Sequence, residues 1–185
     1  MPKVIENLRD QLLAEAQRQI SERGYASTTI RSVARACGVA AGTVYNYFPS
    51  KEVLIATFMA EDWNERLREL RALQGRDAEE TVRAICEALR GFTEKHRALF
   101  SDTEAEKTFA AVFPTRHRQL RAQIAELMAP FCGPAEDVEA EFSARFAAEA
   151  ILTWTTEGVP FDRLWSVLSK LVQTKAQGGI SNEQL

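Results

Sequence analysis

Small and hydrogen-bonding side chains occupy one face of a short segment near the N-terminus, residues 41–48. Apolar Val44 and Phe48 stand four residues apart, so helical periodicity buries them together and turns the opposite face outward. An exposed helix in an ordinary soluble domain would carry Lys, Glu, Arg or Gln on that face. The residues found there have a low profile and polar ends that can hydrogen-bond the edges of DNA bases: Ala41, Gly42, Thr43 and Asn46.

A second set of side chains could bind phosphate oxygens. Tyr45, Tyr47 and Lys51 carry the phenol and ammonium donors that commonly contact the DNA backbone. Ser27 or Thr28 is predicted to cap a helix, which would place free N–H groups and a positive dipole end where a phosphate could dock. The alternatives are that the hydroxyl only caps its helix and that the two tyrosines are half-buried packing aromatics.

Two short helices joined by a glycine turn must position these side chains. Apolar residues at helical spacing predict the first helix, namely Ile30, Val33 and Ala34. Gly38 ends that helix, because glycine adopts a left-handed conformation at little cost. The second helix follows from about residue 41 to residue 48. This arrangement predicts a helix-turn-helix that reads DNA.

The segment from residue 24 to residue 54 resembles the N-terminal signature of the TetR family of bacterial transcriptional regulators. That signature pairs a Thr-Ile helix start with an Ala-x-Gly-Val turn, followed by Gly-x-x-Tyr-x-Tyr-Phe and Ser-Lys-Glu. The residues that match in order and spacing are Gly24, Tyr25, Thr29, Ile30, Ala36, Gly38, Val39, Gly42, Tyr45, Tyr47, Phe48, Ser50, Lys51 and Glu52. The resemblance covers about residues 5 to 60, and one departure from the family is Cys37, at a commonly small, variable turn position.

The resemblance implies which residues contact DNA and how the chain is divided. Base contacts would come from Ala41, Gly42, Thr43 and Asn46, and phosphate contacts from Ser27 or Thr28, Tyr45, Tyr47 and Lys51. The implied fold is all-α, with a three-helix DNA-binding domain and a larger body. We expect the DNA-binding domain at residues 1–50, the ligand-binding and dimerisation domain at 51–176, and a flexible tail at 177–185.

Beyond residue 50 the chain has helical periodicity with Gly and Pro punctuation, and no alternating run long enough to predict a sheet. The expected helices cover residues 51–73, 77–95, 97–112, 114–131, 134–157 and 160–176. With three helices in the DNA-binding domain, nine are expected in all.

The last two predicted helices carry the strongest signal for association. The final helix has a broad apolar stripe, and the helix before it has a flatter face of small residues that permits close helix approach. TetR-like proteins dimerise through these two helices, which implies a homodimer with an interface at Ala147, Ile151, Trp154, Phe161, Leu164, Trp165, Leu168 and Val172. The alternative is that both faces are buried inside a monomer.

In the family the helices between these regions enclose an effector pocket. The candidate lining residues are Phe58, Asp62, Trp63, Cys86, Phe92, Phe109, Phe113, Met128 and Glu149. If Asp62 or Glu149 points inward, its carboxylate would favour a cationic, amine-bearing aromatic ligand. The alternatives are that both acids are solvated and that the apolar residues are ordinary core.

Composition limits the remaining possibilities. Residues 1–51 carry seven Lys or Arg against four Asp or Glu, a net charge of +3, so the rest of the chain carries −6 of the total −3. No apolar run approaches membrane-spanning length and no signal peptide is recognisable, so a cytoplasmic protein is expected. The three cysteines form no CxxC pair and are expected to be structural thiols, with redox sensing as the alternative.

The predicted function is a ligand-responsive transcriptional regulator that binds a palindromic DNA operator as a homodimer. Repression is the commoner outcome in the family, and the expected effector is a small hydrophobic or cationic molecule. The alternative is a DNA-binding protein of the same fold that acts as an architectural or cell-division factor without a small ligand. An enzyme is not expected, nor a cofactor or metal, because the two histidines, His96 and His117, stand in no metal or triad spacing.

Overall fold

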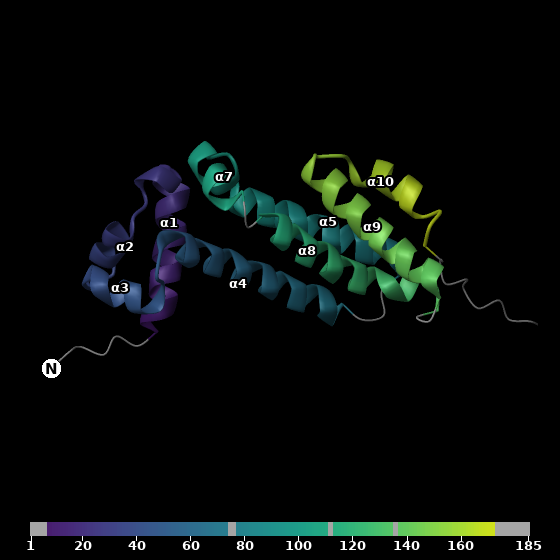
Figure 1. Ribbon diagram of the computed structural model, residues 1–185. Helices are drawn as coiled ribbons and strands as arrows, with labels where there is room; N and C mark the ends of the chain where they lie inside the picture. Colours follow the sequence, from purple (N-terminus) through teal and green to yellow (C-terminus); the bar gives the residue numbers. More distant parts are fainter. Residues whose placement is uncertain (1–6, 74–76, 111–112, 135–136, 173–185) are drawn as a thin grey trace, which may run out of the picture. The chain divides into compact units, whose positions relative to one another are not determined.

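The computed structural model describes residues 7–73, 77–110, 113–134 and 137–172. The described residues are all-helical, with ten α-helices, one 3₁₀ helix and no strand among them (Figure 1). The elements are α1 (Leu8–Ser27), α2 (Ile30–Ala36), α3 (Ala41–Tyr47), α4 (Lys51–Ala72), α5 (Ala78–Lys95), α6 (Arg97–Phe100), α7 (Thr103–Phe109), α8 (Phe113–Met128), η1 (Ala129–Phe131), α9 (Val138–Thr156) and α10 (Phe161–Leu168).

The chain forms two compact units. The first comprises Met1–Leu67 and Gly91–Thr115, and the second comprises Arg68–Arg90 and Arg116–Leu185. The predicted division after residue 50 remains a prediction; the first unit extends beyond it, because α6 and α7 pack on α1. The predicted tail at 177–185 lies outside the described residues.

The first unit is built around α1, with α2 and α3 packed beside it (Figure 1). The predicted core residues of the two short helices are buried as expected, with Val33 and Val44 fully buried and Phe48 2% exposed. Gly38 has φ 69°, which confirms the left-handed turn between α2 and α3. Arg9 of α1 lies with its guanidinium 5.9 Å from the centroid of the Phe48 ring, which ties the end of α3 to α1.

The N-cap of α2 differs from the prediction. Thr29, not Ser27 or Thr28, caps the helix in a reciprocal capping box with Ser32. The Ser32 N–H donates to Thr29 Oγ1 and the Thr29 N–H donates to Ser32 Oγ, both at 3.0 Å. Ser27 still belongs to α1, and the chain leaves that helix late because Gly24, at φ 79°, kinks it rather than ending it.

Three of the predicted body helices are interrupted or shorter. The predicted helix at 97–112 is two helices, because Asp102 leaves the helical conformation and its side chain accepts hydrogen bonds from the N–H groups of Glu104 and Ala105. Asp137 caps α9 in the same way, so that helix begins at Val138 rather than 134. The prediction of nine helices was therefore wrong. Helix α10 ends at Leu168 and its predicted end at 176 lies outside the described residues.

The second unit buries the small-residue face of α9 together with apolar residues of α10 and of the first part of α5. Thr155 of α9 donates a hydrogen bond to the Cys86 sulfur of α5 at 3.3 Å, and Arg90 donates to the Val159 carbonyl at 3.0 Å. None of the described helices is long and apolar enough to cross a membrane.

Candidate nucleic-acid interface

Helix α3 presents the predicted base-reading residues on its outer face. Its inner face is fixed by the buried side chains of Val44 and Phe48, which set the rotation of the helix about its axis. Gly42 and Asn46 are exposed, and Ala41 and Thr43 are half-buried. A helix surface of this low profile can approach the floor of the major groove closely enough for Asn46 to bond a base edge.

Two exposed tyrosines flank this face. Tyr45 is 52% exposed and Tyr47 is 47% exposed. A tyrosine that served mainly to fill the core would bury its ring, so the exposure of both rings favours contact with a partner molecule over internal packing. Their phenol groups are free to reach the DNA backbone on either side of the groove.

Lys51, at the first residue of α4, has its ammonium group held within the protein. Lys51 Nζ donates a hydrogen bond to the Tyr25 carbonyl at 3.1 Å and lies 3.5 Å from the centroid of the Tyr25 ring. An ammonium group has three N–H donors, so donors remain for a phosphate. The first turn of α4 is also capped, because the Val53 N–H donates to Ser50 Oγ at 3.3 Å.

Tyr25 and Glu52 complete the surroundings of Lys51. The Tyr25 hydroxyl donates to Glu52 Oε1 at 3.2 Å, and burial raises the pKa of the phenol above its ordinary value. Hydrogen bonds from Ser50 and from the Glu52 backbone lower the pKa of the Glu52 carboxyl, which therefore stays ionised.

Thr28 does not fit its predicted role. Its side chain is 1% exposed and its hydroxyl donates to the Gly24 carbonyl at 2.9 Å. The hydroxyl thus stabilises the exit from α1 and is shielded from a phosphate. Ser27, the other candidate, is exposed, so of the two predicted hydroxyls it alone keeps an accessible position.

Two arginines of α2 were not predicted from the sequence to contact DNA. Arg31 and Arg35 are both exposed, and no carboxylate of the described chain lies within 4.0 Å of either. By contrast, Arg9 and Arg18 of α1 are paired with acids. The i, i+4 spacing of Arg31 and Arg35 would have revealed their shared helix face.

The predicted effector-pocket residues are divided between the two units. Phe58, Trp63 and Phe109 are buried in the first unit, whereas Cys86 and Met128 are fully buried in the second. Phe92 is half-buried and packs edge-on against Trp63, with ring centroids 5.7 Å apart. The side chain of Phe113, the remaining aromatic candidate, lies outside the described residues.

The two candidate carboxylates have opposite surroundings. Glu149 is exposed and paired with Arg121, so it does not point into a pocket. The Asp62 side chain is only 10% exposed and is paired with Lys95 and with His96, whose Nε2 lies 3.0 Å from Asp62 Oδ2.

Burial alone would raise the pKa of Asp62, but the bonds from Lys95 and His96 outweigh it and lower the pKa. Burial also lowers the pKa of His96, against the opposite pull of the Asp62 carboxylate. The imidazole is therefore neutral at pH 7 and donates its Nε2 proton to Asp62. The inward carboxylate of Asp62 is thus already paired with Lys95 and His96, and its preference for a cationic ligand remains a prediction.

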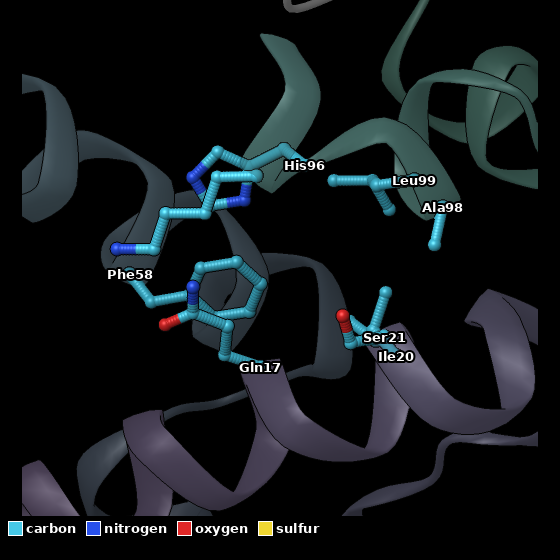
Figure 2. A pocket seen from close by; sticks show the side chains of 8 residues that line it. Gln17, Ile20, Ser21, Phe58, His96, Ala98 and Leu99 are labelled. Atoms are coloured by element: carbon cyan, nitrogen blue, oxygen red, sulfur yellow. The ribbon is translucent and has the colours of Figure 1, made fainter. Parts of the chain in front are cut away.

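A small hollow lies beside this cluster in the first unit. Figure 2 shows Gln17, Ile20 and Ser21 of α1 facing the segment that carries His96 and Leu99, with Phe58 next to the imidazole. Its volume is about 10 Å³, which is room for roughly one water molecule. Pockets for drug-sized molecules are typically about 300 to 1,000 Å³. Of the predicted pocket residues only Phe58 lines it.

The predicted dimer interface is largely interior. Six of its eight residues are buried within the single chain, where they pack the second unit: Ala147, Ile151, Phe161, Leu164, Leu168 and Val172. Only Trp154, at 48% exposed, and the half-buried Trp165 remain accessible. We call the exposed apolar side chains of α9, of α10 and of the residues just after α10 the outer stripe; they are Val138, Phe142, Phe146, Trp154, Val167 and Leu171.

Burial of the cysteines accords with structural thiols. Desolvation raises the pKa of Cys86, Cys132 and the half-buried Cys37 above that of an ordinary thiol. A raised pKa leaves less of the thiolate that reacts with oxidants and electrophiles.

The described residues are all helical, and α2 and α3 have the buried core and the polar, low-profile second helix that are typical of helix-turn-helix DNA-binding domains. Residues 12–57 match the family model for bacterial regulatory proteins of the tetR family. This region of the chain is therefore similar to the tetR family of bacterial regulatory proteins.

Curated relatives are similar over short stretches of the chain. The HTH-type transcriptional regulator HbdR of Aromatoleum sp. (strain CIB) is 39% identical over 54 residues, which cover 29% of this chain and 24% of HbdR. The HTH-type transcriptional repressor KstR2 of Mycolicibacterium smegmatis is 35% identical over 57 residues, which cover 30% of this chain and 28% of KstR2. The chain thus spans only about a quarter of the length of these curated relatives.

A solved structure extends the fold over the body. The TetR transcription regulator from Haloarcula marismortui superposes with a TM-score of 0.62 at 19% identity, covering 91% of this chain and 100% of that protein. At this identity the likeness concerns the fold alone. The predicted all-α, TetR-like fold is confirmed.

Proposed function

We propose that this protein represses transcription by binding a palindromic operator as a homodimer. The observation that carries the proposal is the outer face of α3, where Gly42 and Asn46 are exposed between two half-exposed tyrosines, Tyr45 and Tyr47. Repression is supported by the name of one relative, the repressor KstR2. The protein would act in the cytoplasm, on chromosomal DNA.

The division of contacts follows from exposure. Ala41, Gly42, Thr43 and Asn46 would read base edges, and Ser27, Tyr45, Tyr47 and Lys51 would contact phosphates. Arg31 and Arg35 of α2 add two positive charges to the phosphate-facing surface, since their guanidinium groups are exposed.

Dimerisation is supported by the outer stripe. Phe142 is 63% exposed and Phe146 is 51% exposed, one helical turn apart on α9, with Val167 of α10 56% exposed. Exposed aromatic residues of this number favour a protein interface. A helix-turn-helix protein also needs a second copy to read two half-sites one DNA turn apart. The proposed interface is therefore the outer stripe, with Trp154 as the residue it shares with the sequence prediction.

Release from DNA is proposed to follow binding of an uncharged apolar effector. Asp62 is already paired with basic groups, so a cationic ligand would have to displace Lys95 or His96. Effector binding and DNA binding must weaken each other by the same factor. Thermal-shift measurements with a panel of neutral, cationic and anionic aromatic compounds test whether the effector is uncharged. Preferential stabilisation by neutral compounds supports it, and preferential stabilisation by cations contradicts it.

One observation favours the second candidate function, a DNA-binding architectural or cell-division factor without a small ligand. The hollow beside His96 has room for roughly one water molecule and the aromatic residues around it pack on each other. Operator binding that no compound in the panel changes, together with no stabilisation by any of them, would favour this candidate.

The DNA-binding proposal itself is tested by selecting binding sites from a random duplex library. A two-fold symmetric motif supports a dimeric regulator, and Asn46→Ala should then broaden the motif. Enrichment of no sequence would overturn the proposal.

A further inference from the structure

We propose that Tyr25 is a positioning residue that holds the Lys51 side chain in the conformation in which it binds a DNA phosphate. The inference rests on the proposed function, because it assigns a role within DNA binding. Tyr25 itself is 1% exposed, so it acts through Lys51 and does not contact DNA.

Two contacts to the same residue restrain the Lys51 ammonium group. The Tyr25 carbonyl accepts a hydrogen bond from Lys51 Nζ at 3.1 Å, and the Tyr25 ring centroid lies 3.5 Å from the same nitrogen. The carbonyl uses one N–H and the ring face attracts the positive charge, so neither contact neutralises it. The remaining donors and the full charge are available to a phosphate.

Tyr25 is itself fixed from several sides. Gly24 has φ 79° and ψ 173°, a non-helical conformation, so the chain departs from regular α1 geometry immediately before Tyr25. The Tyr25 hydroxyl donates to Glu52, and Phe109 of α7 packs edge-on against the ring, with centroids 6.1 Å apart and planes at 69°. All these residues belong to the first unit. The support for Lys51 is therefore held by several contacts within one compact unit.

Rigidity matters because lysine loses much conformational entropy when it is fixed. Ordering a lysine side chain costs up to roughly 2 kcal/mol. A side chain that is already ordered in the free protein does not incur this cost when DNA binds. Releasing Lys51 from Tyr25 should therefore weaken DNA binding even though the lysine is still present.

A double-mutant cycle separates positioning from a merely structural role. Affinity for the operator selected by the wild-type protein is measured by fluorescence anisotropy over a series of salt concentrations. Lys51→Met should lower the slope of log affinity against log salt by about one, the loss of one phosphate contact. Tyr25→Leu should weaken binding roughly threefold in the wild-type background, but less than about 1.5-fold in the Lys51→Met background.

Two control variants test whether a simple loss of packing explains the results of the double-mutant cycle. Tyr25→Phe loses the hydroxyl bond to Glu52 but keeps the carbonyl, the ring and its packing against Phe109, and it should therefore bind DNA like the wild type. Phe58→Leu removes a similarly buried aromatic ring that stacks on His96, and should lower the melting temperature without changing the salt slope. Equal losses for Tyr25→Leu in both backgrounds would overturn the inference, as would a weakened Tyr25→Phe.

A measurement on the wild-type protein keeps the test valid even if Tyr25→Leu does not fold. The Lys51 ε-methylene protons lie by the Tyr25 ring and should show an upfield ring-current shift by NMR, both in free protein and in the operator complex. Loss of that shift on DNA binding would overturn the inference while leaving the proposed function intact. Failure of the wild type to enrich any duplex would overturn the proposed function and the inference together.

Discussion

Replacing Phe142 with glutamate is expected to separate the proposed homodimer. Phe142 is the most exposed aromatic residue of the outer stripe and stands one helical turn from Phe146, with ring centroids 6.3 Å apart. A charge at this position would have to be buried without a partner if the interface formed.

The size of the effect follows from the exposed area. A buried aromatic side chain covers about 200 Å², and 63% of the residue is exposed, so roughly 125 Å² is available for burial. At about 25 cal/mol per Å², covering both copies across a two-fold axis contributes about 6 kcal/mol. This is an upper bound, because association also orders side chains. Loss of half of this contribution, about 3 kcal/mol, would still raise the dimer Kd about 100-fold.

Sedimentation velocity over a series of protein concentrations measures this change. At concentrations about tenfold above the wild-type Kd, the wild type should sediment mainly as a dimer and Phe142→Glu mainly as a monomer. Phe100→Glu is the matched control, because Phe100 is also exposed, at 41%, but belongs to the first unit and not to the outer stripe. A Phe142→Glu variant that remains dimeric, or a wild type that is monomeric throughout, would refute the reasoning.

Three further predictions concern the first unit. Asn46→Ala should relax the sequence preference, whereas Tyr47→Phe should weaken binding to all duplexes alike. Equal losses of sequence preference and of overall affinity in the two variants would contradict these separate roles. Hydrogen bonds from Arg18 lower the pKa of Glu15 to about 2 from 4.5, so its pairing stabilises the fold fully above pH 4.5, and this contribution is lost as pH falls towards 2. The difference in urea stability between wild type and Glu15→Gln should therefore shrink over that range, and a difference that is constant with pH would disprove it. Asp62→Asn should lower the free energy of unfolding by roughly 1 to 3 kcal/mol, measured in urea, because Lys95 and the buried His96 lose their charged partner; no loss would show that the pairing is not stabilising.

The helix-turn-helix could be predicted from the sequence because its determinants are local. Val44 and Phe48 are four residues apart and Gly38 takes a conformation that few other residues adopt, so periodicity and turn chemistry sufficed. By contrast, local sequence did not show which of three consecutive hydroxyl residues caps α2. Packing buries Thr28 and leaves Thr29 as the cap, and no local preference separates two adjacent threonines.

The body was harder to predict for a physical reason. Helix α9 carries apolar residues around most of its circumference, so periodicity shows that the helix is apolar without showing which face the chain covers. The alanine face packs inside the chain and Phe142 and Phe146 face outward, so Ala147 and Ile151 of the predicted interface are buried within the chain. The break at Asp102 was missed because a single capping side chain outweighed a continuous helical pattern.

The central claim is that the outer face of α3 reads DNA. The most direct test is selection of binding sites from a random duplex library, carried out in parallel with the wild type and with Asn46→Ala. The predicted result is a two-fold symmetric motif for the wild type and a motif with lower information at matching positions in both half-sites for the variant. Identical motifs from the two proteins, or no enrichment by the wild type, would contradict the claim.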